Sequence, residues 1–208
     1  MVRPAASEGY AKSLVTRARI LDAARLEAGE RGFHKASVAR IAARADTAIG
    51  SVHYHFGSRT QLLRELMRTL MADLTARLAA ARSDPASDFF TRLRAEQLAY
   101  VDYIRANPHH VRLADEIKFH EPDLYREGMD DWVTLLAAEI RAGVAERSLR
   151  PMDDTEILAQ AHFLLGARHY LESMLGGDDG VEGAAVVDAY IGLVRDGLGR
   201  RRDPERRA

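Results

Sequence analysis

Four hydrogen-bonding side chains stand close together in one short stretch of the chain: Ser51, His53, Tyr54 and His55. A hydroxyl, a phenol and two imidazoles can donate or accept hydrogen bonds, and none carries a negative charge that would repel a phosphate. Such groups suit contact with the phosphates and base edges of a nucleic acid. The residue types are therefore those expected of a surface that recognises DNA.

Two short helical patterns position these side chains, with a break at residues 45–48. The apolar residues of each pattern recur three and four positions apart: Val38, Ile41, Ala42 and Ala45, then Ile49, Val52 and Phe56. Two helices joined by a tight turn form a helix-turn-helix, whose second helix enters the major groove of DNA. The spacing predicts this motif, with the hydrogen-bonding side chains facing outward from its second helix.

The charge of the chain is divided unevenly. Residues 1–64 hold 11 Lys and Arg against 5 Asp and Glu, a net of +6, whereas residues 65–208 hold 19 against 26, a net of −7, which together give the overall −1. A basic segment that coincides with a helix-turn-helix is the expected electrostatic signature of a protein that binds nucleic acid.

The composition narrows the remaining possibilities. The 208 residues contain no cysteine, which excludes disulfides, thiolate catalysis and cysteine-based zinc sites. No uninterrupted run of about 18 apolar residues occurs, and the N-terminus lacks the apolar core of a secretory signal. We expect a cytoplasmic protein with no membrane partner, no cofactor and no metal ion.

Almost every segment has helical periodicity, so we predict an all-α fold of about nine helices. Beyond the helix-turn-helix, the expected helices span 16–31, 59–82, 87–106, 109–119, 123–147, 154–176 and 182–199, with Thr16 and Ser58 as N-caps and Gly32 as a stop. We expect a flexible arm over 1–15, a DNA-binding domain over 16–60, a ligand-binding and dimerisation domain over 61–200, and a charged tail over 201–208.

The segments TRARILDAA, ERGF, SVARIAARA and GSVHYHFGSRTQLL, within about residues 16–66, resemble the N-terminal domain of the TetR family of transcriptional repressors. Three positions of the motif depart from that family's usual residues. Asp46 replaces the turn glycine, Ala48 replaces a serine that opens the second helix, and Ile49 replaces a lysine. Asp tolerates the left-handed backbone, so we expect the turn to survive. In the first helix, Glu27 and Ala28 replace a bulky apolar pair.

The resemblance implies which residues meet the operator DNA. Ser37, Arg44 and Arg59 would contact phosphates, Thr47 would cap the second helix in place of Ala48, and Gly50 would allow close approach to the duplex. The remaining contacts would come from the outward face: Ser51, His53, Tyr54 and His55. For Ser37 and Ser58, helix capping is an alternative or additional role. Tyr54 could instead pack in the core.

The resemblance also implies a homodimer that pairs through its last two helices. One stripe of helix 182–199 is Val187, Ile191, Val194 and Leu198, a second stripe is Ala185, Ala189 and Gly192, and helix 154–176 offers Ala159, Phe163, Gly166 and Tyr170. Two apolar stripes on a terminal helix exceed what one core usually needs. Packing within the core of a single chain is the alternative.

A small-molecule effector is the third implied partner. Aromatic, Met and His residues at helical spacing could line its pocket: Met67, Met71, Tyr100, Tyr103, Phe119, Tyr125, Met129, Trp132, His162 and His169. His162 and His169, seven residues apart on one helix, form the best polar pair. Ligand binding would alter the spacing of the two DNA-binding heads through helix 59–82. Each of these residues could instead be ordinary core.

Two other functions fit parts of the pattern. A metal-assisted helical hydrolase could use the eight histidines, but the H-E-x-x-H motif is absent. A ligand-independent architectural DNA-binding protein would share the fold and bind DNA with a low specificity ratio. We predict a repressor that is released from a near-palindromic operator by its effector, and no enzymatic activity.

Overall fold

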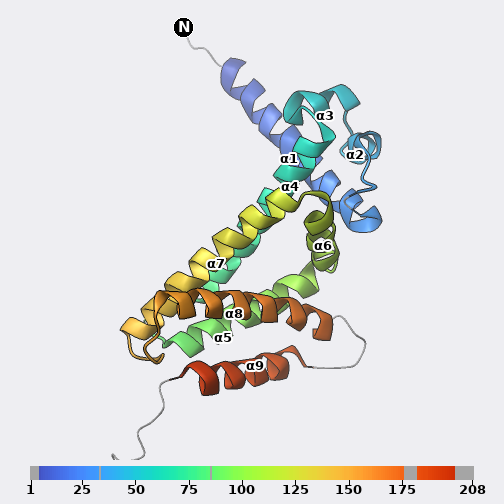
Figure 1. The fold of residues 1–208 in the computed structure, drawn as a ribbon. Helices are drawn as coiled ribbons and strands as arrows, with labels where there is room; N and C mark the ends of the chain where they lie inside the picture. Colours follow the sequence, from blue (N-terminus) through green and yellow to red (C-terminus); the bar gives the residue numbers. More distant parts are fainter. Residues whose placement is uncertain (1–4, 33, 85, 176–181, 200–208) are drawn as a thin grey trace, which may run out of the picture. The chain divides into compact units, whose positions relative to one another are not determined.

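A computed structural model describes residues 5–32, 34–84, 86–175 and 182–199, and within them the chain forms nine α-helices (Figure 1). The helices are α1 Ala5–Arg31, α2 Val38–Arg44, α3 Ile49–Phe56, α4 Arg59–Ala81, α5 Phe89–Ala106, α6 His110–His120, α7 Pro122–Ala145, α8 Asp154–Leu175 and α9 Gly183–Leu198. The all-α prediction is confirmed. Within the described ranges, none of the helices combines the length and the hydropathy needed to cross a bilayer.

The chain forms two compact units. The first comprises Met1–Ala72 and His109–Tyr125, and the second comprises Asp73–Pro108 and Arg126–Ala208. The domain boundary expected from the sequence follows residue 60, within the first turn of α4. In the structure, the first part of α4 packs with the helix-turn-helix, and α6 joins the same unit although it lies far along the chain. The predicted tail over 201–208 lies outside the described residues.

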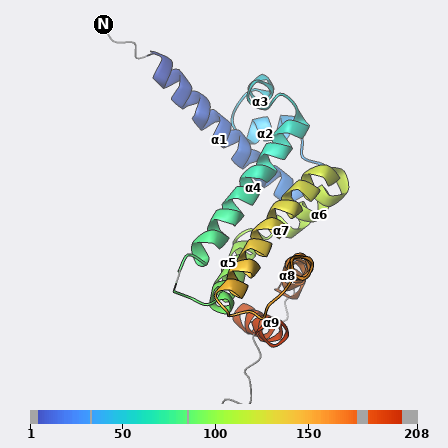
Figure 2. The same ribbon diagram turned by 60° about the vertical axis from the view of Figure 1, so that its left-hand side comes forward.

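The first unit is built around α1. Helices α2 and α3 lie beside it, in blue and cyan (Figures 1 and 2), and the start of α4 closes the core. The buried side chains come from all of these helices and from α6, among them Ile20, Ala24, Ile41, Val52, Leu62, Leu66, Leu113 and Ile117. The Arg112 guanidinium of α6 donates hydrogen bonds to the carbonyls of Ala28 and Gly29 near the end of α1. Helix α6 is therefore part of the support for the DNA-binding motif.

The second unit packs α9 against α5 and α8. Its core gathers apolar side chains from α5, α7, α8 and α9, among them Phe89, Leu93, Ile140, Ala161, Leu164, Val187 and Ile191. A single backbone bridge pairs Leu149 with Gly199. This bridge ties the loop after α7 to the end of α9.

Several helix ends follow the sequence prediction, and one does not. Gly32 ends α1 with a positive φ of 94°. Ser58 forms a reciprocal capping box with Gln61, since each side chain accepts a hydrogen bond from the other's backbone N–H. The prediction of Thr16 as an N-cap is wrong. Helix α1 begins at Ala5, and the Thr16 hydroxyl donates back to the Lys12 carbonyl inside the helix.

Candidate nucleic-acid interface

The turn between α2 and α3 has the backbone geometry that the motif requires. Asp46 adopts a left-handed conformation with φ 47°. Its N–H donates to the Ala43 carbonyl, and the N–H of Thr47 donates to the Ala42 carbonyl, which together make a Schellman motif at the end of α2. The Arg19 guanidinium of α1 donates to the Ala45 carbonyl and approaches the Asp46 carboxylate. The turn is therefore held without the usual glycine.

Helix α3 presents two different faces. Val52 and Phe56 are buried in the first core, whereas Tyr54 is 83% exposed, so the alternative that Tyr54 packs in the core is wrong. Gly50 and His53 are also exposed, and Ser51 and His55 are partly exposed. Ile49 was expected on the buried face, but half of its surface is exposed. The outward face of α3 thus carries the polar side chains chosen from the sequence, together with Ile49.

The histidines and the glycine of α3 have distinct local settings. The Nδ1 of His53 lies 3.0 Å from the Gly57 carbonyl oxygen at the C-terminal end of the helix. The His55 ring meets the Tyr54 ring edge to face, with centroids 5.2 Å apart. No atom lies within 4 Å of the position that a Cβ of Gly50 would take. The chain itself therefore does not require glycine at position 50.

The structure tests the capping roles predicted for Ser37 and Thr47. Ser37 is the N-cap residue of α2, but its side chain makes no capping hydrogen bond. The N-cap of α3 is Ala48 and not Thr47, and no side chain caps that helix. Capping by Thr47 is therefore a wrong prediction. The hydroxyl of Ser37 is not used for capping, unlike that of Ser58.

Arg44 and Arg59, both predicted to contact phosphate, are engaged within the first unit. Arg44 donates two hydrogen bonds to the Glu30 carboxylate, at 2.9 and 2.6 Å, and these lower the pKa of Glu30 from its ordinary value. Arg59 donates to the carbonyls of Ala36 and His34, at 2.7 and 2.6 Å. Both guanidinium groups hold the helix-turn-helix together. Sequence spacing could not show this because the partners are distant along the chain.

Glu27 supplies a buried charge between α1 and α2. Its carboxylate, only 1% exposed, forms an ion pair with Arg40 of α2 and lies 3.5 Å from Arg31 and 3.8 Å from Arg44. At this position the TetR family usually has a bulky apolar residue. Ala28 is fully buried beside it. Helix α2 is instead attached to α1 by an ion-pair cluster.

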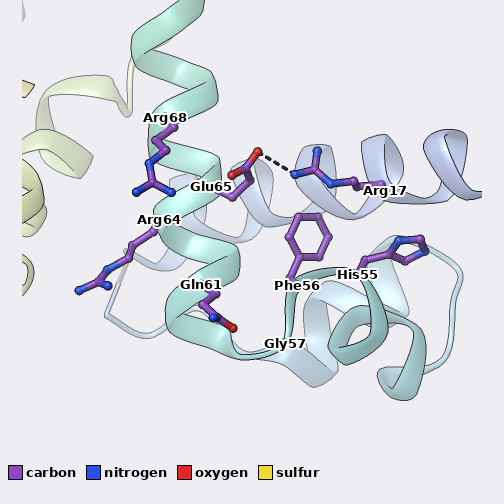
Figure 3. A pocket seen from close by; sticks show the side chains of 8 residues that line it. All are labelled: Arg17, His55, Phe56, Gly57, Gln61, Arg64, Glu65 and Arg68. Atoms are coloured by element: carbon purple, nitrogen blue, oxygen red, sulfur yellow. Dashed lines mark hydrogen bonds and ion pairs between the residues drawn. The ribbon is translucent and has the colours of Figure 1, made fainter.

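An open hollow of about 530 Å³ lies beside the end of α3, between α1 and α4 (Figure 3). Four basic or imidazole side chains line it with one carboxylate: Arg17, His55, Arg64, Arg68 and Glu65. Arg17 donates to Glu65 at 2.7 Å and lies over the Phe56 ring at 5.1 Å, while Arg64 and Arg68 project from α4 away from that pair. Sequence reasoning missed the three arginines because they lie outside the motif, and the net basic charge of residues 1–64 hinted only at Arg17 and Arg64.

The predicted effector residues are divided between the two units. Met67, Met71, Phe119 and Tyr125 belong to the first unit, where Met67 is buried and Phe119 is exposed. Tyr100, Tyr103, Met129 and Trp132 belong to the second, where both tyrosines are buried and the other two pack against the core. His162 is exposed on α8. The side chain of His169 lies outside the described residues, so the proposed pair with His162 has no structural description.

The predicted dimer residues fall into a buried group and an exposed group. Val187, Ile191, Val194 and Leu198 are buried in the second unit's own core, so that stripe is not available to another copy of the chain. The outer face of α8 is available, with Phe163 and Tyr170 each 70% exposed. On α9 the exposed small and apolar residues include Ala185, Ala189, Gly192 and Leu193, and the charged Asp188, Arg195 and Asp196 are exposed as well. Periodicity found both apolar stripes of α9 but not which of them the chain covers.

Among the residues that the structure describes, no three His, Asp or Glu side chains form a group that could hold a metal ion. His53 and His55 stand two positions apart on α3, a spacing that points side chains to different sides of a helix. His53 lies against the Gly57 carbonyl, whereas His55 lines the hollow.

Comparisons with known proteins show what the helix-turn-helix segment and the whole chain are similar to. A sequence model described as bacterial regulatory proteins, tetR family, matches residues 20–66. The chain is 37% identical over 92 residues to the HTH-type transcriptional regulator BetI of Burkholderia cenocepacia (strain HI2424). This match covers 42% of this chain and 45% of that protein. The chain thus matches less than half the length of that relative.

Two further proteins match along most of their length. The HTH-type transcriptional repressor KstR2 of Rhodococcus jostii (strain RHA1) is 28% identical over 214 residues, covering 95% of this chain and 98% of the repressor. A transcriptional regulator from Saccharomonospora viridis, solved in complex with choline, is 23% identical with a TM-score of 0.71, covering 89% of this chain and 98% of that one. This last likeness shows the fold alone. Residues 20–66 therefore match the model of the tetR family of bacterial regulatory proteins, and the chain is similar over nearly its whole length to a transcriptional repressor.

Proposed function

We propose that this protein is a homodimeric, cytoplasmic transcriptional repressor that binds a near-palindromic operator and leaves it when a small molecule binds. The observation that carries the proposal is the outward face of α3, where exposed Gly50, His53 and Tyr54 stand on a helix anchored by buried Val52 and Phe56. A helix presented in this way fits the major groove of DNA. The regulatory relatives support the same function.

The DNA site would combine base contacts from α3 with phosphate contacts around it. Ser51, His53 and Tyr54 offer hydrogen bonds to base edges, and the Ser37 hydroxyl offers one to a phosphate. Because Arg44 and Arg59 are engaged within the unit, much of the positive charge toward DNA would come from elsewhere. The nearest other basic surface is the hollow beside α3, since His55 belongs to both surfaces; there Arg17 and Arg64 are paired with Glu65 and Glu121, and Arg68 adds a further cation.

The dimer would form through the exposed faces of α8 and α9. Phe163, Tyr170 and Leu193 are large apolar side chains left mostly open to solvent. Gly166 and Gly192 lie on the same faces, and no atom lies within 4 Å of a Cβ built on either. An apolar helix face with small residues suits close packing against a second copy of itself. Two-fold pairing would place two α3 helices on the two halves of a palindrome.

The effector would bind in the second unit, as an organic molecule of modest size. The Saccharomonospora viridis regulator was solved in complex with choline, so a protein of this fold holds a small organic ligand. In this chain, Tyr100, Met129 and Trp132 supply aromatic and apolar surface. Helix α4 contributes Arg59–Ala72 to the first unit and Asp73–Ala81 to the second, so it is the element through which binding would act on DNA affinity.

DNA selection with the purified protein tests this function. We expect enrichment of one near-palindromic sequence and its protection in a footprint. Tyr54→Ala combined with His55→Ala should then weaken operator binding by about a hundredfold or more, because each lost base or phosphate contact contributes about 1–3 kcal/mol. The dimer should remain intact in sedimentation velocity.

Phe119→Ala provides the matched control, since it removes an exposed aromatic side chain of the same unit from α6. Operator affinity should be unchanged in this variant. Equal affinity of the double variant and the unaltered protein would show that α3 does not make the contacts proposed. Enrichment of no sequence would refute the function itself.

A further inference from the structure

A buried ion pair joins α5 and α8 inside the second unit. Glu96 is 2% exposed and Arg168 5%, and the Arg168 Nη2 donates to the Glu96 Oε1. The other carboxylate oxygen, Oε2, accepts a hydrogen bond at 3.3 Å from the Nη1 of Arg82. Glu96 therefore faces two guanidinium groups, and each of its oxygens already has a partner. Burying charges in this way is costly, so a pair retained here calls for an explanation.

The Arg168 guanidinium also lies between two aromatic rings. Its central carbon is 5.2 Å from the centroid of Tyr100 and 5.2 Å from that of Trp132. Such a pair of rings is the usual binding place for an organic cation. Here the chain's own arginine occupies it. A second cation would have to displace a buried side chain from Glu96 and from both rings.

Two buried polar atoms of this cluster have no hydrogen-bond partner among the residues that the structure describes: the Arg168 Nε and the Tyr190 hydroxyl oxygen. Unsatisfied buried groups are rare in folded proteins because each costs stability. Tyr190 of α9 is close enough to Arg168 and Glu96 for their charges to affect its pKa, which burial raises well above the ordinary value. Its hydroxyl therefore stays protonated and can donate.

The Arg168 guanidinium uses only part of its capacity to bind carboxylates. The Nε and Nη2 of an arginine lie on the same edge of the guanidinium, and together they can hold both oxygens of one carboxylate. Glu96 takes only the Nη2 because Arg82 holds its second oxygen. Among the side chains that the structure describes, none accepts a hydrogen bond from the Nε–H. The open donor on this edge and the Tyr190 hydroxyl suit a further oxygen that carries negative charge.

We propose that Arg168 and Tyr190 form the polar end of the effector site and that the effector is an organic carboxylate with an apolar body. One carboxylate oxygen accepts hydrogen bonds from the Arg168 Nε–H and the Tyr190 hydroxyl. The apolar body lies against Leu98, Met129 and Trp132, which are partly buried at the edge of the second core. A quaternary ammonium is rejected because Arg168 already occupies the rings. The inference rests on the proposed function, whose effector it assigns to a chemical class.

The test measures ligand binding to the full-length protein by calorimetry and thermal unfolding. The probes are benzoate, decanoate and cholate, with benzamide and decanamide as neutral counterparts and choline as the cation. We expect at least one carboxylate to bind and raise Tm, and its neutral counterpart and choline to leave Tm unchanged. Binding of choline or of the amides as tight as that of the acids overturns the proposal, and so does the absence of binding by all three acids.

Tyr190→Phe isolates the assigned contact, because it removes only a hydroxyl that has no partner in the described structure. The variant should be no less stable without ligand and should bind the carboxylate about tenfold more weakly or worse. Arg168→Lys keeps the charge, lacks the Nε–H and should lose affinity similarly. Tyr10→Phe, an exposed tyrosine of α1, serves as the control. Unchanged carboxylate affinity in Tyr190→Phe overturns the assignment.

DNA binding is measured in parallel so that the two proposals fail separately. A protein that selects a near-palindrome but binds no carboxylate keeps the proposed function and loses the effector class. A protein that binds a carboxylate through Tyr190 but selects no operator keeps the site and loses the function as a repressor.

Discussion

Single buried polar side chains have a large effect on the stability of this chain. Glu27 and Glu96 are buried carboxylates, and each forms an ion pair with an arginine of a neighbouring helix. The partner is Arg40 in the first unit and Arg168 in the second. A third buried polar group, His110 of α6, is governed by burial itself, which lowers its pKa to about 4 from the ordinary 6.5. Each of these residues makes stability depend on the state of one proton or one partner.

His110 should make the first unit sensitive to mild acid. Below pH 6.5 the histidine of the unfolded chain takes up a proton that the folded protein refuses until about pH 4, so the free energy of unfolding falls as the pH drops through this window. The loss should reach about 2 kcal/mol at pH 5 relative to pH 7. Urea unfolding at both pH values measures it.

His110→Gln removes the titrating group, so its stability should depend less on pH over the same range. The carboxylates titrate in both proteins and cancel in the comparison. If the variant and the unaltered protein lose the same free energy between pH 7 and pH 5, burial of His110 is not the cause.

At the scale of helices, most of the architecture was predictable from the sequence, since local signals mark the ends. Gly32, the Ser58–Gln61 capping box and the prolines near the ends of α5 and α6 end or begin helices close to their expected places. The extra turns of α1 before Thr16 were missed because a threonine has the same appearance as an N-cap whether or not a helix precedes it. Its bond to the Lys12 carbonyl could be known only from the structure.

The candidate site, too, was predictable only where local signals in the sequence determine it. Tyr54 and His53 were identified as outward residues because helical spacing separates the two faces of α3. The engagement of Arg44 by Glu30 and of Arg59 by Ala36 was not predictable, because long-range packing selects those partners. Periodicity likewise identified the stripe of Val187 as apolar but could not tell whether its own chain or a second copy covers it.

The attachment of α2 to α1 should depend on Glu27. Glu27→Ala leaves Arg40 without its buried partner and opens a small cavity, so the first unit should lose about 2–4 kcal/mol of stability. Glu30→Ala removes another carboxylate of α1 that pairs with an arginine of α2, but this carboxylate is half exposed and solvent screens the pair, so the loss should be clearly smaller. Denaturant unfolding compares the two, and equal losses would show that Glu27 is no anchor.

For the molecule as a whole, assembly should be separable from folding. Gly166→Arg places a bulky cation on the exposed face of α8, where the chain has no atom within 4 Å of the new Cβ. The fold should persist, while the dissociation constant of the dimer should rise about tenfold or more, with a parallel loss of operator affinity.

Sedimentation equilibrium measures that constant, and Gly128→Arg on α7 is the matched control, because position 128 is equally open within the chain. We expect the control to dimerise normally. A dimer that tolerates Gly166→Arg would place the contact between copies on another surface.

The composition of the first unit has a consequence for how the protein is made. Its core needs Leu113 and Ile117 of α6, which are synthesised after α5 and the early part of the second unit. On the ribosome, the DNA-binding motif emerges first but cannot complete its core until residues up to Tyr125 have left the exit tunnel. We therefore expect the nascent helix-turn-helix to stay incompletely folded until α6, which packs against it but is synthesised later, has emerged.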